Sequence, residues 1–271
     1  MPIRRVLFLT TAMLIVATLA LAHDLFLKLD SYFLEPHVRL RVTVINGTFT
    51  KSEGYVTPDR LADVSLVAGT RTRLRAADVW SRGGGPDSTS VLSLALGEAG
   101  TYVIGVSVSP RELALAADAF NAYLKEDGLP DILEARRAAN ELGKGARERY
   151  SKHVKAVFQV GDARTLDYAF VLGYPAEIVP LGNPYAAGRT SLRVRCLVDG
   201  KPSANQVVLW GGGGAAAERS TRTDSAGVAE VILDAPGRWY VKFVHMERAS
   251  RSGLAGLDYE SKWATLTFET R

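Results

Sequence analysis

Cysteine and histidine are scarce in this 271-residue sequence, which contains one cysteine and four histidines. A chain with a single cysteine cannot form an internal disulfide, so its stability must come from hydrophobic cores. Cys196 lies in a run of alternating residues, Leu192 to Val198, which is typical of a strand with one buried face. We therefore expect Cys196 to be a small buried hydrophobic residue and not a thiolate metal ligand.

Sequence motifs of the common catalytic machineries are also missing. The chain has no Walker-type phosphate loop, no HExxH pair, no CxxC pair and no Ser-His-Asp order. The glycine run at residues 211–214 is followed by neither a helix start nor a Lys-Ser/Thr pair, so it predicts a flexible loop. These absences favour a protein that is not an enzyme.

A strong excess of one charge is missing as well. The chain has 33 basic and 29 acidic residues, a net charge of +4. Loss of Arg4 and Arg5 with an N-terminal leader would leave 33 − 2 = 31 basic residues against 29 acidic ones, a net charge of +2. This balance does not call for nucleic acid as a partner. The apolar content of 47% is typical of a folded globular protein.

A long hydrophobic run stands at the N-terminus. Arg4 and Arg5 precede apolar residues 6–21, and the small residues Ala20 and Ala22 form an A-x-A cleavage site. This order predicts a secretory signal peptide at residues 1–22 and an exported product. Cleavage would leave no stable membrane anchor, and no cysteine follows the cleavage site that could carry a lipid.

Cleavage after Ala22 would make His23 the first residue of the mature chain. Its free α-amino group and its imidazole Nδ1 could then close a chelate ring on one metal ion, because neutral imidazole is the commonest protein ligand of transition metals. The amine has a reference pKa of about 7.7–8, so a metal ion can displace its proton near neutral pH. The alternative is that His23 is only a tolerated residue at a frayed, solvated terminus.

Strand-like patterns dominate the rest of the chain. Short alternating segments separated by turns predict an antiparallel β-sandwich over residues 23–174. A helical insertion is expected at about residues 109–150, because Ser109, Pro110 and Glu112 form a helix-capping pattern ahead of an apolar stripe. The insertion would contain two helices, and we expect its many charged residues to form a solvated face.

The proline-rich residues 175–189 predict a stiff connector between two domains. Residues 190–271 then contain six strand-like segments and predict a second, smaller sandwich. The expected fold class is therefore mainly β, with two antiparallel β-sandwich domains of the immunoglobulin-like or transthyretin-like type, the first carrying the two-helix insertion.

Several segments of the chain resemble known families. The second sandwich resembles the carboxypeptidase-regulatory-like (transthyretin-like) domain through Asp199-Gly200-Lys201-Pro202, Thr223-Asp224-Ser225-Ala226-Gly227 and Gly237-Arg238-Trp239-Tyr240-Val241. Nearly all of the mature chain resembles an uncharacterised periplasmic family that is labelled the periplasmic component of a cobalt/nickel ABC-type uptake system. That second resemblance rests on His23-Asp24-Leu25-Phe26-Leu27, Arg149-Tyr150-Ser151-Lys152, Val171-Leu172-Gly173-Tyr174-Pro175, His245-Met246 and Asp258-Tyr259-Glu260-Ser261-Lys262-Trp263-Ala264. It implies a leading histidine, this fold and a periplasmic location, and the label of the family makes an inner-membrane metal transporter a possible partner.

The other histidines differ in their prospects as metal ligands. His37 lies beside a turn about 30 Å from His23 along an extended strand, so we reject it as a partner. His153, at a strand entrance, is expected to be a surface or hydrogen-bonded histidine. His245 lies near a strand end, where a returning strand would bring Glu260 close to it, so we predict a metal site of His23, His245 and Glu260. The alternative for His245 is a loop histidine above a solvated charge cluster.

Three classes of function remain open. The first is a periplasmic protein that binds nickel or cobalt and supports their uptake, with copper as a rival because of its position in the Irving–Williams order. The second is a non-catalytic binding or scaffold module, which would need an exposed aromatic patch. The third is a copper oxygenase with a histidine brace, which would need a second histidine and an open coordination position.

Overall fold

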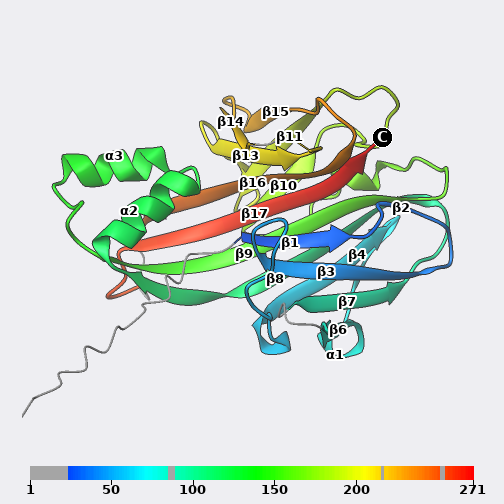
Figure 1. Cartoon of the computed structure of the whole chain (residues 1–271), viewed down its shortest axis with the longest axis horizontal. Coiled ribbons are helices and arrows are strands. Elements are labelled where there is room, and N and C mark those ends of the chain that lie inside the picture. Colours follow the sequence, from blue (N-terminus) through cyan, green and yellow to red (C-terminus); the bar gives the residue numbers. More distant parts are fainter. Residues whose placement is uncertain (1–23, 85–88, 215–216, 251–253) are drawn as a thin grey trace, which may run out of the picture.

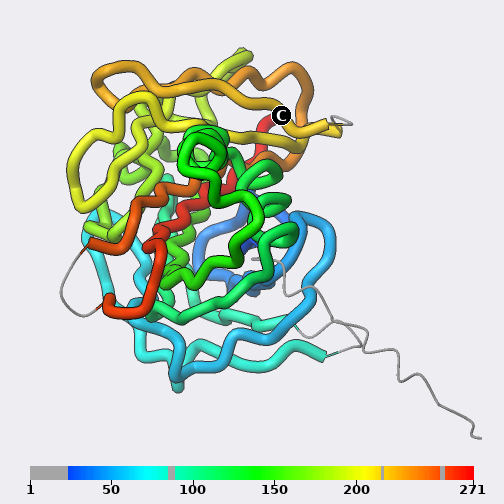
Figure 2. Tube along the Cα trace, turned by 90° about the vertical axis from the view of Figure 1, so that its left-hand side faces the viewer, coloured from blue at the N-terminus to red at the C-terminus, as the bar shows by residue number. Residues whose placement is uncertain are grey.

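The computed structural model describes residues 24–84, 89–214, 217–250 and 254–271, and this part of the chain forms three β layers (Figure 1). A central sheet lies between two smaller sheets, with helices α2 (Ala117–Glu126) and α3 (Pro130–Ala138) at one end. In Figure 2 the cyan N-terminal segments lie at the bottom of the view and the yellow and orange C-terminal segments lie at the top. The predicted fold class, mainly β and built as sandwiches, is confirmed.

Strands from both halves of the chain form the central sheet. Among the described residues its spatial order is β14 (Arg219–Arg222), β13 (Val207–Gly212), β16 (Gly237–Arg248), β17 (Tyr259–Thr270), β9 (Ala146–Val160), β8 (Gly100–Leu115), β4 (Leu61–Ala68) and β5 (Thr70–Arg73), and β2 (Phe33–Leu34) also pairs with β9. β17 and β9 run parallel, whereas the other neighbours in this order are antiparallel. The two predicted sandwiches therefore share one continuous sheet.

The two smaller sheets cover opposite faces of the central sheet. One contains β1 (Asp24–Leu29), β3 (Arg39–Gly47), β7 (Ser90–Ala95) and β6 (Trp80–Arg82), and the other contains β10 (Ala176–Pro180), β11 (Ser191–Val198), β12 (Lys201–Pro202) and β15 (Val228–Ile232). Thr265 and Thr267 of β17 donate hydrogen bonds to the carbonyls of Leu25 and Leu27 in β1, at 2.7 and 2.6 Å. Because side chains alternate along a strand, the neighbouring Leu266 faces the other small sheet. Short helical segments occur at η1 (Pro58–Arg60), α1 (Ala76–Val79) and η2 (Leu166–Ala169).

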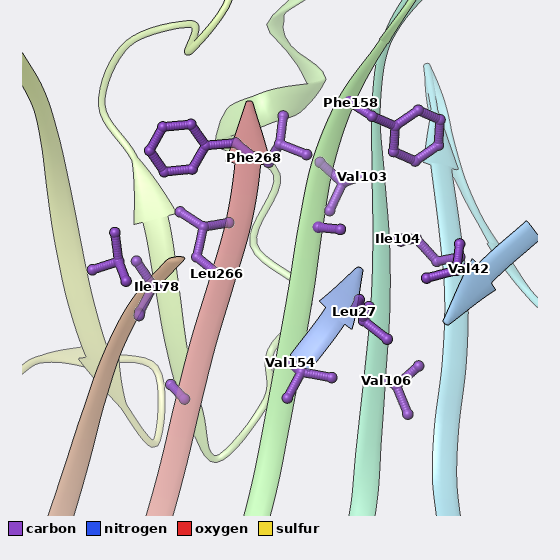
Figure 3. Close-up of a cluster of buried hydrophobic side chains, with 14 of the residues drawn as sticks. Leu27, Val42, Val103, Ile104, Val106, Val154, Phe158, Ile178, Leu266 and Phe268 are labelled. Carbon is purple, nitrogen blue, oxygen red and sulfur yellow. The ribbon is translucent and has the colours of Figure 1, made fainter. Parts of the chain in front are cut away.

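A single hydrophobic cluster extends through all three layers. Figure 3 shows part of it, with Leu27 and Val42 from one small sheet, Val154 and Leu266 from the central sheet, and Ile178 from the other small sheet. Cys196 belongs to this cluster and is fully buried, as predicted. A second, smaller cluster lies under the two helices and joins them to the last residues of β16 and the first residues of β17. No helix in the described part of the chain has the length and apolar character needed to cross a bilayer.

The helical insertion is shorter than the sequence predicted. Residues 109–115 continue strand β8, and residues 146–150 belong to β9, so only α2 and α3 lie between them. The ladder shifts register between Val108 and Arg111, which leaves Pro110 outside the pairing. The capping pattern at Ser109 therefore gave a wrong helix start. The reason is that pairing with β9 satisfies the backbone groups of this segment across the sheet.

Residues 175–189 are not simply a connector, because residues 176–180 form strand β10 and pair with β11. A buried ion pair holds this strand on the central sheet. The Lys155 ammonium donates to Glu177 at 2.9 Å, and the two side chains are 2% and 1% exposed. The Glu177 carboxylate also accepts hydrogen bonds from the backbone N–H groups of Leu172 and Gly173, at 2.7 and 2.9 Å. The predicted boundary is thus part of the shared core.

Candidate functional site

The three residues of the predicted metal site do not all fall within the described structure. His23 lies outside the described residues, which begin at Asp24. His245 pairs with Lys262, and Glu260 pairs with Glu247, so His245 and Glu260 point to the same face of the β16–β17 ladder. Asp24 contacts Lys242, which has the opposite parity on β16 and therefore lies on the other face. The sheet separates His245 and Glu260 from Asp24.

The surroundings of His245 do not favour a cation. Its cross-strand neighbour is Lys262, whose ammonium donates to Asp199 at 2.6 Å. Burial lowers the pKa of His245, and the Lys262 charge acts in the same direction, while Glu247 and Asp199 oppose them. A lysine beside the imidazole repels a metal ion, so we give His245 and Glu260 no part in the site developed below.

The two other histidines have ordinary structural environments. His153 is 3% exposed, and its ring nitrogens form hydrogen bonds with Ser107 (Nδ1, 2.9 Å) and Ser151 (Nε2, 3.0 Å). Burial lowers the pKa of His153 to about 3, so the ring is neutral at physiological pH. This histidine is hydrogen-bonded, as predicted, but buried. His37 lies in a turn with φ of 60° and approaches Glu98 at 3.5 Å on the surface.

A cluster of buried charges lies instead at the start of β1, where the chain passes between helix α2 and strand β16. The Lys242 ammonium is surrounded by three carboxylates: Asp24 at 2.7 Å, Asp127 at 3.2 Å and Glu218 at 3.5 Å. The side chains of Lys242, Asp24 and Asp127 are only 8%, 12% and 14% exposed. We call these four residues the Lys242 cluster. Charged groups so well screened from water interact strongly with one another.

The charges of the Lys242 cluster shift the pKa values of its members. Burial alone would lower the pKa of Lys242, but Asp24, Asp127 and Glu218 outweigh burial and raise this pKa well above its ordinary value. Burial raises the pKa of Asp127 to about 7, although Lys242 opposes the shift. Lys242 is therefore permanently charged, whereas the Asp127 carboxyl group exchanges its proton near neutral pH.

A second group of buried charges adjoins this cluster. Burial lowers the pKa of Lys152 to about 8, and the Lys152 ammonium lies 5.3 Å from the ring centre of Trp263. Burial raises the pKa of Glu148 to about 7, and its carboxylate accepts hydrogen bonds from Tyr123 and Ser261. Coulombic attraction from Asp24 and Asp127 partly restores the pKa of Lys152, so the two groups form one electrostatic unit. Several of its members change protonation near pH 7, which is characteristic of functional sites.

Two carboxylate oxygens in this region, Oδ1 of Asp24 and Oε2 of Glu148, are buried and have no hydrogen-bond partner among the described residues. A buried anionic oxygen that lacks a partner is costly and requires an explanation. Beside Asp24 lies a pocket of about 260 Å³, lined by Tyr123, Asp127, Lys242 and neighbouring residues. The described part of the chain therefore begins at the edge of this pocket, with Asp24 among the lining residues.

The described residues alone do not form a metal site. No three His, Cys, Asp or Glu side chains within residues 24–84, 89–214, 217–250 and 254–271 are arranged to hold an ion. In the Lys242 cluster the ammonium already occupies the space between the carboxylates. Any metal ligand set here would need donors from the residue that precedes Asp24, together with the unpartnered oxygen of Asp24.

Lys242, Lys152 and Asp127 were not predicted from the sequence, although two of them leave a signal in it. Lys242 interrupts the apolar run from Trp239 to Val244. Lys152 directly precedes the mainly apolar second half of its strand. A lysine inside an apolar strand run is rarely buried without a partner. Asp127 follows helix α2 and gives no comparable signal, because its burial depends on where the helix docks.

The fold and site describe a mainly β protein with a buried, titratable charge cluster at the start of its first strand. A family model described as a domain of unknown function, DUF4198, matches residues 20–247, so the chain belongs to this family. No functionally curated protein matches the sequence.

Similar solved structures are remote. The D0-D1 domain of intimin is 14% identical with a TM-score of 0.22, covering 91% of this chain and 98% of that one. A segment of two fibronectin type-III domains from chicken tenascin is 10% identical with a TM-score of 0.23, covering 92% and 98%. A DUF4785 family protein from Legionella pneumophila is 12% identical with a TM-score of 0.24, covering 80% and 50%. Such low TM-scores support no inference about function.

Proposed function

We propose that the protein, once residues 1–22 have been removed, binds divalent nickel or cobalt in the periplasm and supports the uptake of these ions. The amine and imidazole of His23 would chelate the ion, and Oδ1 of Asp24 would supply an oxygen. Copper would compete, because nitrogen donors bind it more tightly than nickel or cobalt. An inner-membrane metal transporter would receive the ion.

The observation that carries this proposal is the unpartnered Oδ1 of Asp24. The other oxygen of the same carboxylate, Oδ2, accepts a hydrogen bond from the Lys242 ammonium at 2.7 Å, which fixes the carboxylate in one orientation. The amine and imidazole of His23 and the Oδ1 atom of Asp24 could then bind one ion together. Because these donors belong to two consecutive residues, little chain entropy would be lost. Lys242 fits this arrangement as a positioning residue, because it balances the carboxylates that would otherwise repel one another.

The other two classes of function have less support. A copper oxygenase with a histidine brace needs a second histidine, but no histidine among the described residues lines the pockets beside Asp24. A purely scaffolding protein would not need buried groups that titrate near neutral pH. Neither class accounts for the orphaned oxygen of Asp24.

The experiment is a calorimetric titration of Ni²⁺, Co²⁺, Cu²⁺ and Zn²⁺ into protein that begins at His23. A variant with one alanine added before His23 keeps every side chain but removes the free amine from that residue. We expect the extension and the Asp24→Asn substitution each to weaken nickel binding by about tenfold or more, the range seen for groups that support a metal site.

His245→Ala is the matched control, since it removes an imidazole on the opposite face of the sheet. We expect it to leave nickel affinity unchanged. If the alanine extension binds nickel as tightly as the mature protein, the chelate is refuted. If His245→Ala abolishes binding instead, the ion is held on the other face.

A further inference from the structure

Strands β1 and β16 bring three pairs of side chains face to face. The first pair is attractive, with Asp24 and Lys242 at 2.7 Å. The second pair is aromatic, because the rings of Phe26 and Tyr240 lie 5.2 Å apart, edge to face. The residues two further along β1 and two back along β16 are Lys28 and Arg238, so the third pair brings together two positive charges.

The positive pair has no direct ion-pair partner among the described residues. Neither Lys28 nor Arg238 forms an ion pair there: Lys28 donates to the carbonyl of Phe49 at 3.2 Å, and Arg238 donates to the carbonyl of Asp30. Burial lowers the pKa of Lys28, Arg238 lowers it further, and the opposing attraction of Asp30 is weaker. Glu269, opposite Arg238 in the ladder, instead accepts a hydrogen bond from the backbone of Tyr32. Two facing cations that no described carboxylate pairs with directly attract an anion, although Asp30 acts on Lys28 and Glu218 also lines the groove.

A groove of about 550 Å³ opens over this pair. Its lining combines Lys28 and Arg238 with Phe49, Tyr240 and the glycines at 211–214. The same Phe49 and Tyr240 also line the pocket beside Asp24, so the groove and that pocket adjoin each other. The Phe49 and Tyr240 rings lie 4.9 Å apart and form an aromatic wall between the positive end and the Lys242 cluster.

The size and lining of the groove exceed what a bare ion needs. A metal ion with its first shell of water would contact the carboxylates of the Lys242 cluster. It would not reach the aromatic wall of Phe49 and Tyr240 or the cations Lys28 and Arg238 beyond that wall. An organic molecule with a carboxylate would satisfy all three regions, because the carboxylate pairs with Lys28 and Arg238 while its carbon skeleton packs on the rings. Inorganic phosphate would use the cations but gain nothing from the aromatic surface.

We propose that this groove binds a small organic carboxylate through Lys28 and Arg238. If the proposed metal-binding function holds, the cargo is then a metal–carboxylate chelate, with the ion at the His23 and Asp24 end and the free carboxylate at the other. Glycine at position 213 keeps this wall of the groove in place, because a Cβ there would lie 2.2 Å from the Trp239 ring and push the loop away.

Calorimetric titration of citrate, and separately of inorganic phosphate, into the metal-free mature protein tests the proposal. We expect saturable citrate binding that is tighter than phosphate binding and is weakened about tenfold or more by Lys28→Gln or Arg238→Gln, the scale of a lost charge-assisted hydrogen bond. Lys28→Arg keeps the charge and should retain citrate binding. Arg222→Gln, which removes a surface cation outside the groove, is the control and should bind citrate like the unaltered protein.

The proposal is overturned if citrate does not bind, if phosphate binds more tightly, or if Lys28→Gln and Arg238→Gln bind citrate unchanged while still folded by circular dichroism. Nickel titration of the same variants in carboxylate-free buffer separates the two proposals. Intact nickel binding with no citrate binding refutes only the carboxylate site. If citrate binds as expected but nickel affinity is the same with and without the free amine of His23, only the metal function is refuted.

Discussion

Replacement of Lys242 by methionine is the sharpest test of the Lys242 cluster. Methionine fills a similar volume but leaves Asp24, Asp127 and Glu218 without their shared cation. Lys242 and its two nearest carboxylates are 8–14% exposed, so the change breaks a largely buried ion pair. We expect a loss of about 3–5 kcal/mol in the free energy of unfolding, the usual result of leaving a buried charge unpaired.

The loss should also depend on pH in a defined direction. Without Lys242, whose charge lowers it, the pKa of Asp127 rises further above its unfolded value, so the folded variant binds more protons than its unfolded chain. Its stability should therefore recover as pH falls from 8 to 5, and urea denaturation at both pH values measures the difference. Arg222→Met is the control, because the Arg222–Asp131 pair is 37% and 67% exposed and should contribute only about 0–1 kcal/mol. A loss for Lys242→Met no larger than that of the control, at both pH values, would refute the reasoning.

Three further outcomes follow from buried groups elsewhere in the fold. The pKa of Glu148 rises from 4.5 to about 7 on folding, so its ionisation destabilises the folded protein as pH rises through that window. We expect Glu148→Gln to raise the free energy of unfolding by about 3 kcal/mol at pH 8 and to leave it unchanged near pH 4. Urea denaturation measures both values, and an equal effect at the two pH values would contradict the prediction. Glu177→Gln leaves Lys155 buried and unpaired, and we expect it to lower the free energy of unfolding by about 3–5 kcal/mol, whereas an unchanged midpoint would argue against the buried pair. The imidazole of His153, with a pKa of about 3, should show no change in its ring-nitrogen NMR shifts between pH 8 and pH 5, and a titration in that range would mean that the ring is accessible to water.

The fold class could be predicted from the sequence because alternation along a strand is a local property. The buried position of Cys196 followed from the alternation between Leu192 and Val198. The start of the helical insertion did not follow, since the capping pattern at Ser109 competes with pairing to a strand some 40 residues away. Local signals cannot decide such a competition, because its outcome depends on which backbone groups find partners in the folded sheet.

The candidate site was less predictable for a related reason. The prediction joined His245 and Glu260 to the N-terminus, but the face of the sheet that β1 covers depends on tertiary packing. Lys242 and His245 are three residues apart on one strand, so they point to opposite faces, and β1 lies on the Lys242 side. The β16–β17 ladder places His245 and Glu260 on one face, and the metal-binding role predicted for them stays a prediction. The burial of Asp127 depends on the docking of a helix that no local pattern fixes.

The location of the bound ion tests the central claim most directly. Crystals of the protein that begins at His23, soaked in nickel and measured at the nickel absorption edge, would show the ion as an anomalous difference peak. The account predicts one peak at the start of β1, within bonding distance of the first residue's amine and imidazole and of the Asp24 carboxylate. A peak beside His245 and Glu260, or no peak at the first residue, would contradict it.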